Sequence, residues 1–146
     1  MEQIEIIEDG SLVAERGGSF PHKGLTAKII RAFYEVYNRL GRGFLEKLYE
    51  KALIIELEAA GLQVECQVPA TVNYKGETIG DYLLDLVVET KVVLELKSVS
   101  TLSEEHAAQL INYLRATKYE LGLLLNFGDK PEIRRMLYTS DYKRKY

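Results

Sequence analysis

The chain of 146 residues has no tryptophan, one cysteine (Cys66) and two histidines, His22 and His106. A lone cysteine excludes a disulfide framework within the chain and fits a reducing cytoplasm. One cysteine and two histidines cannot form an ordinary structural zinc site, which takes four such ligands. We therefore expect a cytoplasmic protein without structural zinc, and we interpret Cys66 as a small strand residue.

Long hydrophobic runs and an excess of positive charge are also missing. No apolar run approaches the roughly 20 residues that span a bilayer, and the acidic start MEQIEIIEDG does not have the pattern of a signal peptide. The net charge of -3 gives no general attraction for nucleic acid. The basic segment 130–146 is interpreted as a solvated terminal segment. We expect a flexible lead-in over residues 1–20 and one domain over residues 21–146, with no membrane association.

The most informative stretch is DYLLDLVVETKVVLELK, residues 81–97, where Asp85, Glu95 and Lys97 interrupt apolar runs. Charged side chains within apolar strands cost free energy unless they are paired or bound to an ion. Two strands joined by a three-residue loop would place Val88 opposite Val92 and Asp85 opposite Glu95. We favour this register because it keeps one face wholly apolar and gathers the three charged residues on the other face. The apolar face would be core, and it contains Leu84, Leu86, Val88, Val92, Leu94 and Leu96.

Two carboxylates at cross-strand contact distance repel each other unless a proton or a cation lies between them. Mg2+ or Mn2+ would suit these oxygen ligands. Lys97 points the same way as Glu95, and it could orient a water nucleophile or stabilise charge on a phosphate. A structural hairpin with an ion pair between Lys97 and Glu95 or Asp85 explains the same spacing. Both interpretations stay open on spacing alone.

Periodicity and turn residues predict the order of the elements. We expect helices over 26–40, 44–60 and 104–118, strands over 63–74, 78–88, 92–99 and 121–127, and a short last helix over 132–138. Pro69 predicts that the first strand is an edge or bulged strand. This order predicts an α/β domain with a central mixed four-stranded sheet flanked by helices.

These residues and this order resemble the PD-(D/E)xK nuclease superfamily. Its restriction-endonuclease-like αβββαβ core carries an acid on the second strand, E-x-K on the third, and often a Glu on the first helix and a Gln on the crossover helix. Residues 43–49, GFLEKLY, are similar to the signature of the small prokaryotic GxxExxY proteins, a branch of that superfamily. The resemblance covers roughly residues 25–138.

The resemblance implies a metal-dependent nuclease, in which a water activated by Mg2+ or Mn2+ attacks a phosphodiester bond. It makes Asp85 and Glu95 the metal ligands, Lys97 the catalytic lysine, Glu46 a carboxylate that completes or orients the metal site, and Gln109 a supporting amide. The implied partner is nucleic acid, DNA in preference to RNA. Because so small a core would bind DNA weakly, we expect a homodimer or a partner protein. The alternative function is a non-catalytic nuclease-fold module that binds nucleic acid or a protein.

Overall fold

The structure is a computed structural model that describes residues 22–138. Its elements, in chain order, are α1 (Lys23–Leu40), α2 (Glu46–Ala59), β1 (Val64–Tyr74), β2 (Glu77–Val88), β3 (Val92–Lys97), α3 (Glu104–Ala116), β4 (Leu121–Phe127) and β5 (Pro131–Leu137). The lead-in expected over residues 1–20 and the last part of the basic segment lie outside the described residues. No helix within residues 22–138 is long and apolar enough to cross a membrane.

The five strands form one sheet in the order β1-β2-β3-β4-β5. Strands β3 and β4 are parallel and joined by α3, whereas the other neighbours are antiparallel. A parallel pair needs such a crossover connection. The predicted α/β architecture with an αβββαβ core and a mixed sheet is therefore confirmed, with five strands in place of four.

The fifth strand corrects the short helix predicted over residues 132–138. Along β5 the side chains alternate between the two faces of the sheet, as a strand requires. Arg134 donates to Glu104 Oε1 of α3 at 3.1 Å, and Arg135 donates to Thr26 Oγ1 of α1 at 2.7 Å. Both arginines are buried, so this part of the basic segment is not solvated as expected.

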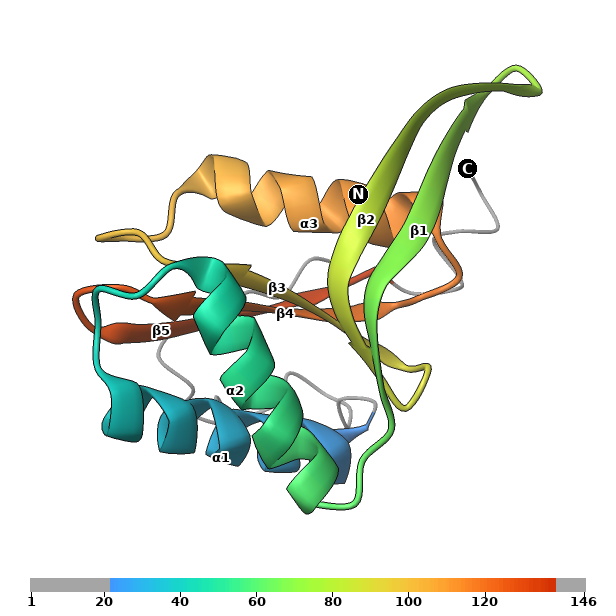
Figure 1. The fold of residues 1–146 in the computed structure, drawn as a ribbon. Helices are drawn as coiled ribbons and strands as arrows, with labels where there is room; N and C mark the ends of the chain where they lie inside the picture. The colour runs from blue at the N-terminus through green and yellow to red at the C-terminus, as the bar shows by residue number, and fades with distance from the viewer. Residues whose placement is uncertain (1–21, 139–146) are drawn as a thin grey trace, which may run out of the picture.

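Helices cover both faces of the sheet: α1 and α2 lie on one face and α3 on the other (Figure 1). The α1–α2 core contains Ile29, Phe33, Leu53, Leu57, Leu86, Leu94, Leu123 and Leu125. The α3 core contains Leu84, Val87, Val93, Leu110, Leu114, Leu124 and Met136. Strand β4 is buried along its whole length, as its sequence LGLLLNF predicted.

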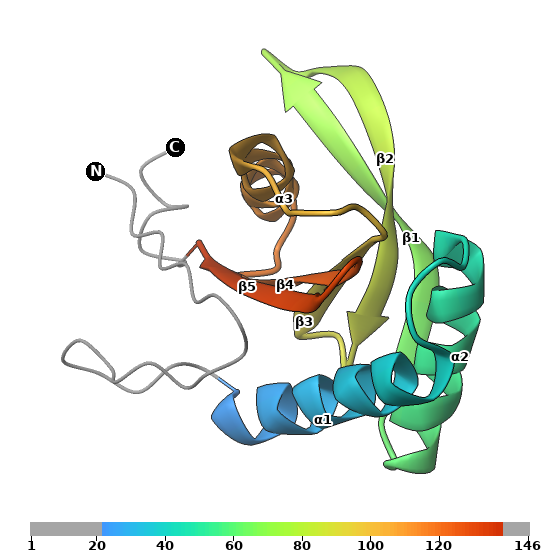
Figure 2. The same ribbon diagram turned by 90° about the vertical axis from the view of Figure 1, so that its left-hand side faces the viewer.

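The hairpin of β1 and β2 extends past the rest of the sheet and curls beside α3 (Figures 1 and 2). As predicted, β1 is an edge strand, and Pro69 pairs with Leu83 within its ladder. The curl changes one prediction: Leu84 joins the α3 core instead of sharing the core of Leu86 and Val88. Strand β2 therefore turns between Leu84 and Leu86, at Asp85.

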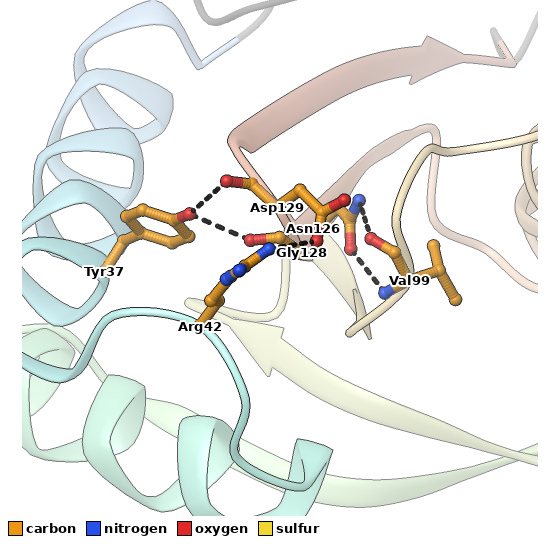
Figure 3. Close-up of polar contacts among 6 residues, drawn as sticks. All are labelled: Tyr37, Arg42, Val99, Asn126, Gly128 and Asp129. Carbon is orange, nitrogen blue, oxygen red and sulfur yellow. Dashed lines mark hydrogen bonds and ion pairs between the residues drawn. The ribbon is translucent and has the colours of Figure 1, made fainter.

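A set of polar contacts fixes the segment that follows β3 (Figure 3). The side-chain amide of Asn126 donates to Val99 O at 2.8 Å and accepts from Val99 N at 3.0 Å. Tyr37 donates to the carbonyls of Gly128 and Asp129, and Arg42 pairs with Asp129 at 2.9 Å. A Cβ on Gly128 would lie 1.7 Å from Val99 O, so only glycine fits there. These contacts join the end of β3 to α1 and to the β4–β5 turn.

Candidate functional site

The candidate site lies where β2 and β3 separate. The pairs Val88–Val92 and Leu86–Leu94 confirm the predicted register, and the ladder ends just before Asp85 and Glu95. There the Asp85 amide donates to Glu95 Oε1 at 3.1 Å, and the Leu96 amide donates to Asp85 Oδ2 at 2.9 Å. Each carboxylate accepts a hydrogen bond from the backbone of the opposite strand. These two hydrogen bonds hold the acids together at the point where β2 and β3 separate.

Burial makes this carboxylate pair electrostatically unfavourable when both members are charged. Glu95 is 7% exposed, and burial followed by the charge of Asp85 raises its pKa to about 8. Burial also raises the pKa of Asp85, although the hydrogen bond from the Leu96 amide acts to lower it. A shared proton or a cation relieves such a pair. Lys97 is half-buried at the end of β3. Like a bound cation, its positive charge favours the ionised carboxylates and lowers the pKa of both acids.

A third carboxylate, Glu50 of α2, was not anticipated from the sequence. Its side chain is buried, and its charge raises the pKa of Asp85. Glu50 pairs with Lys47 at 3.4 Å and accepts a hydrogen bond from Gln67 Nε2 at 3.2 Å. It shares the buried side of α2 with Leu53 and Leu57, at positions i, i+3 and i+7. A glutamate on the apolar face of a helix was the signal available in the sequence.

Gln67 occupies a strained backbone position beside the site. It lies in β1 between Cys66 and Val68, which pair with Leu86 and Leu84 of β2, so it is level with Asp85. Its φ of 53° lies in the left-handed region, which non-glycine residues in strands rarely adopt. Strain of this kind concentrates at functional sites. Residues on three adjacent strands thus depart from regular pairing at the same level of the sheet.

Tyr113 of α3 lies near the carboxylate pair. It is 8% exposed, and its ring lies 4.5 Å from the ring of Tyr82 on β2. Burial, followed by the charges of Glu95, Tyr82 and Asp85, raises its pKa to about 12. The phenol therefore stays neutral beside the carboxylates at ordinary pH.

The remaining candidates from the sequence lie at the surface. Glu46 is the first residue of α2 and is exposed, where the helix dipole favours a carboxylate. Gln109 is exposed on α3. His106 belongs to the capping box of α3, with its Nδ1 accepting from the Ser103 amide at 3.0 Å. The structure thus gathers Asp85, Glu95 and Lys97, and it leaves the roles predicted for Glu46 and Gln109 untested.

The donor atoms of the site suit a hard divalent cation. Within residues 22–138 no group of three or more His, Cys, Asp or Glu side chains is already arranged to hold a metal. Mg2+, however, commonly takes one or two carboxylates and keeps several waters. Asp85 and Glu95 offer two carboxylates in contact, and Glu50 is a third close enough to affect Asp85 electrostatically. This donor set fits Mg2+ or Mn2+ better than a metal that prefers sulfur or imidazole.

A groove lies between the β1–β2 hairpin and α3. Its volume is about 550 Å³, and it is lined by Thr71, Val72, Asn73, Tyr82, Asn112, Arg115 and Ala116. Tyr82 belongs to this wall and also contacts Tyr113. Amide, hydroxyl and guanidinium groups therefore line this groove, and Tyr82 connects its wall to Tyr113.

Glu95 should make the stability of the protein depend on pH. Its pKa is about 8 in the folded state, against 4.5 for an unperturbed glutamate. Between these values the unfolded chain releases the proton first, so the free energy of unfolding falls as pH rises and levels off above about pH 8. Glu95→Gln removes the titrating group, and we expect it to abolish most of this dependence. Urea denaturation from pH 5 to 9 in EDTA measures the slope, and equal slopes for both proteins would contradict the prediction.

Comparison with known proteins adds one finding. A family model described as the PD-(D/E)XK nuclease superfamily matches residues 23–136. No curated protein and no solved structure matches the chain. The matched range runs from α1 into β5, and it includes Asp85, Glu95 and Lys97.

Proposed function

The chain belongs to the PD-(D/E)XK nuclease superfamily, and from this we propose that it is a metal-dependent nuclease that hydrolyses nucleic-acid phosphodiester bonds. One observation carries the proposal: Asp85 and Glu95 are held in contact, each by the backbone of the other strand, beside Lys97. A structural hairpin gains nothing from two adjacent buried acids, since they are tolerated only with a shared proton or a bound cation. The proposal includes the prokaryotic GxxExxY branch, a cytoplasmic location and DNA in preference to RNA.

Each residue has a distinct role in this proposal. Asp85 and Glu95 hold Mg2+ or Mn2+, and Glu50 assists from α2. The ion, when bound, supplies activation of the attacking water and screening of charge on the scissile phosphate. Lys97 places a positive charge at the carboxylates, where it orients the nucleophile and stabilises charge on the phosphate. Gln67 keeps Glu50 in position through its hydrogen bond.

The groove beside α3 supports a nucleic-acid substrate. Asn73 and Asn112 offer amides that can bond to bases or sugars, and Arg115 offers positive charge for the phosphate backbone. Tyr82 of the groove wall contacts Tyr113, on which the charges of Glu95 and Asp85 act, and we propose that a strand in the groove continues past these tyrosines to bring a phosphate to the carboxylates. Gln109, exposed on the same helix, is proposed as a supporting amide at this edge.

The choice between Glu50 and Glu46 tests the proposed site. We expect Glu50→Gln to lower metal-dependent cleavage about 10- to 100-fold, the usual cost of losing a group that supports a metal ligand. Glu46→Gln is the matched control, with the same substitution in the same helix at an exposed position, and we expect less than about a threefold change. Initial rates are measured with Mn2+ and Mg2+ on single- and double-stranded DNA and RNA.

The outcomes of this experiment test the choice of Glu50 and the proposed nuclease activity separately. If Glu46→Gln is the damaging substitution, the helix carboxylate is the one that the resemblance implied and our choice of Glu50 is wrong. If the wild type cleaves none of the four substrates above its level in EDTA, the nuclease proposal fails. Circular dichroism spectra of both variants establish that the fold is retained.

A further inference from the structure

The outer side of α2 and its N-cap residue Leu45 carry an apolar stripe, formed by Leu45, Leu48, Ala52, Ile55 and Ala59. Within this stripe Ala52 is partly buried against the α1–α2 core. The residues of the stripe recur at alternating intervals of three and four, the spacing of a seam that packs against another helix. Leu45 is 79% exposed, Leu48 47% and Ile55 66%. The buried residues of α2, among them Leu53 and Leu57, lie on the other side.

The exposed residues of this stripe are not needed for packing α2 onto its own fold. Contacts of α2 with α1, β1 and β3 already bury its other side. Figure 2 shows α2 along one side of the described fold, with no helix or strand drawn outside it. Single exposed apolar residues are ordinary, but a continuous apolar stripe on a monomer indicates an interaction surface.

We propose that this stripe packs against the same stripe of a second copy, with the two α2 helices antiparallel across a two-fold axis. Charge supports this arrangement: Lys51 and Glu58 are exposed in opposite halves of the helix, whereas Lys47 is already paired with Glu50. An antiparallel pair sets Lys51 of each copy beside Glu58 of the other. A parallel pair would set Lys51 beside Lys51 and Glu58 beside Glu58, which opposes association. The two helix dipoles also oppose each other in the antiparallel pair.

The side chains of the stripe suit one antiparallel register. A two-fold axis between Leu53 and Ile54 sets Leu48 opposite the partner's Ala59 and Ala52 opposite the partner's Ile55. Each large side chain then meets a small one, which lets the helices approach closely. Lys51 and Glu58 share one flank of the stripe, so Lys51 lies beside the partner's Glu58, and the reverse contact is made by symmetry.

The size of α2 sets the expected strength of the dimer. With 14 residues the helix is about 21 Å long, so the stripe alone forms an interface at the small end of specific ones. We therefore expect association in the micromolar range. Glu50 lies on the opposite, buried side of α2, so this surface is separate from the proposed metal site and does not depend on the nuclease proposal.

Sedimentation velocity of the full chain from about 1 to 100 µM tests the dimer. We expect the wild type to shift from monomer to dimer over this range, and Leu48→Ser with Ile55→Ser to stay monomeric at 100 µM with an unchanged circular dichroism spectrum. Ile79→Ser is the control, because Ile79 is similarly exposed, at 65%, on the β1–β2 hairpin. It should dimerise like the wild type.

Charge exchange tests the antiparallel orientation. Lys51→Glu and Glu58→Lys should each weaken the dimer about tenfold, and the double exchange should restore it, since opposite charges face each other again. A monomeric wild type at 100 µM, or a dimer unchanged by the serine double variant, would overturn the proposal. A monomer that the serine substitutions destabilise would also overturn it. That result would indicate that the stripe packs against other residues of the same chain.

Discussion

Replacement of Lys97 by alanine is expected to lower metal-dependent phosphodiester cleavage about 100- to 1000-fold, the usual loss when one group that stabilises transition-state charge is removed. Lys97 is the last residue of β3, and its charge already acts on both carboxylates of the site. Its place in the sheet depends on the backbone, which pairs with Asn126 of β4. The variant should therefore fold normally. Single-turnover rates with saturating Mn2+ measure the effect, and thermal melting checks the fold.

Lys91→Ala is the matched control for this prediction. Lys91 lies exposed in the turn between β2 and β3, so its removal should change the rate by less than about twofold. A Lys97→Ala protein that cleaves at the wild-type rate would contradict the catalytic role. The non-catalytic alternative predicts a different pattern: no cleavage by the wild type, and salt-sensitive nucleic-acid binding that Lys97→Ala weakens.

The position of the acid pair could be predicted because few registers are compatible with the sequence. In a hairpin with period-two alternation, a one-residue slip exchanges the two faces of a strand. Only the three-residue loop keeps Leu86, Val88 and Leu94 on one face, and these residues do share the α1–α2 core. The loop forms without glycine, since Glu89 and Thr90 adopt positive φ values of 54° and 53°. Local pattern was sufficient here because the hairpin is a local structure.

The predictions were wrong for residues whose environment is set by contacts with residues far away in the chain. Arg134 and Arg135 suggested an exposed helix, but in the structure they are satisfied by Glu104 and Thr26, which lie 30 and 109 residues away in the chain. Glu50 could be taken for a surface residue, since Lys47 one turn earlier suggests an exposed helical pair. Neither the hydrogen bond from Gln67 to Glu50 nor the left-handed backbone of Gln67 follows from periodicity. The ligand pair was therefore predictable, whereas the groups that support it required tertiary structure.

The double variant Asp85→Asn, Glu95→Gln should lose any stabilisation by Mn2+ while melting at least as high as the wild type in EDTA. A metal that binds only the native state raises stability by about 2.7 kcal/mol at 100 times its Kd. For a chain of this size such a gain raises Tm by roughly 5–10 °C. The amide oxygens of Asn and Gln can still accept the hydrogen bonds from the Leu96 and Asp85 positions. The substitutions remove two buried acids without breaking that network, so the unfavourable electrostatics of the pair disappear together with the metal ligands.

Asp81→Asn is the control for the double variant. Asp81 is an exposed carboxylate on the same strand, where it accepts a hydrogen bond from Thr71 at 3.1 Å, and its loss should leave the Mn2+ response intact. Melting curves at several Mn2+ concentrations, compared with EDTA, distinguish the two interpretations of the charged hairpin. A metal site predicts a Tm that rises with Mn2+ in the wild type and in Asp81→Asn only. A structural ion-pair network predicts no response in any protein, because nothing in it requires a cation other than Lys97. An equal response in the double variant would place Mn2+ elsewhere and remove the physical basis for the proposed chemistry.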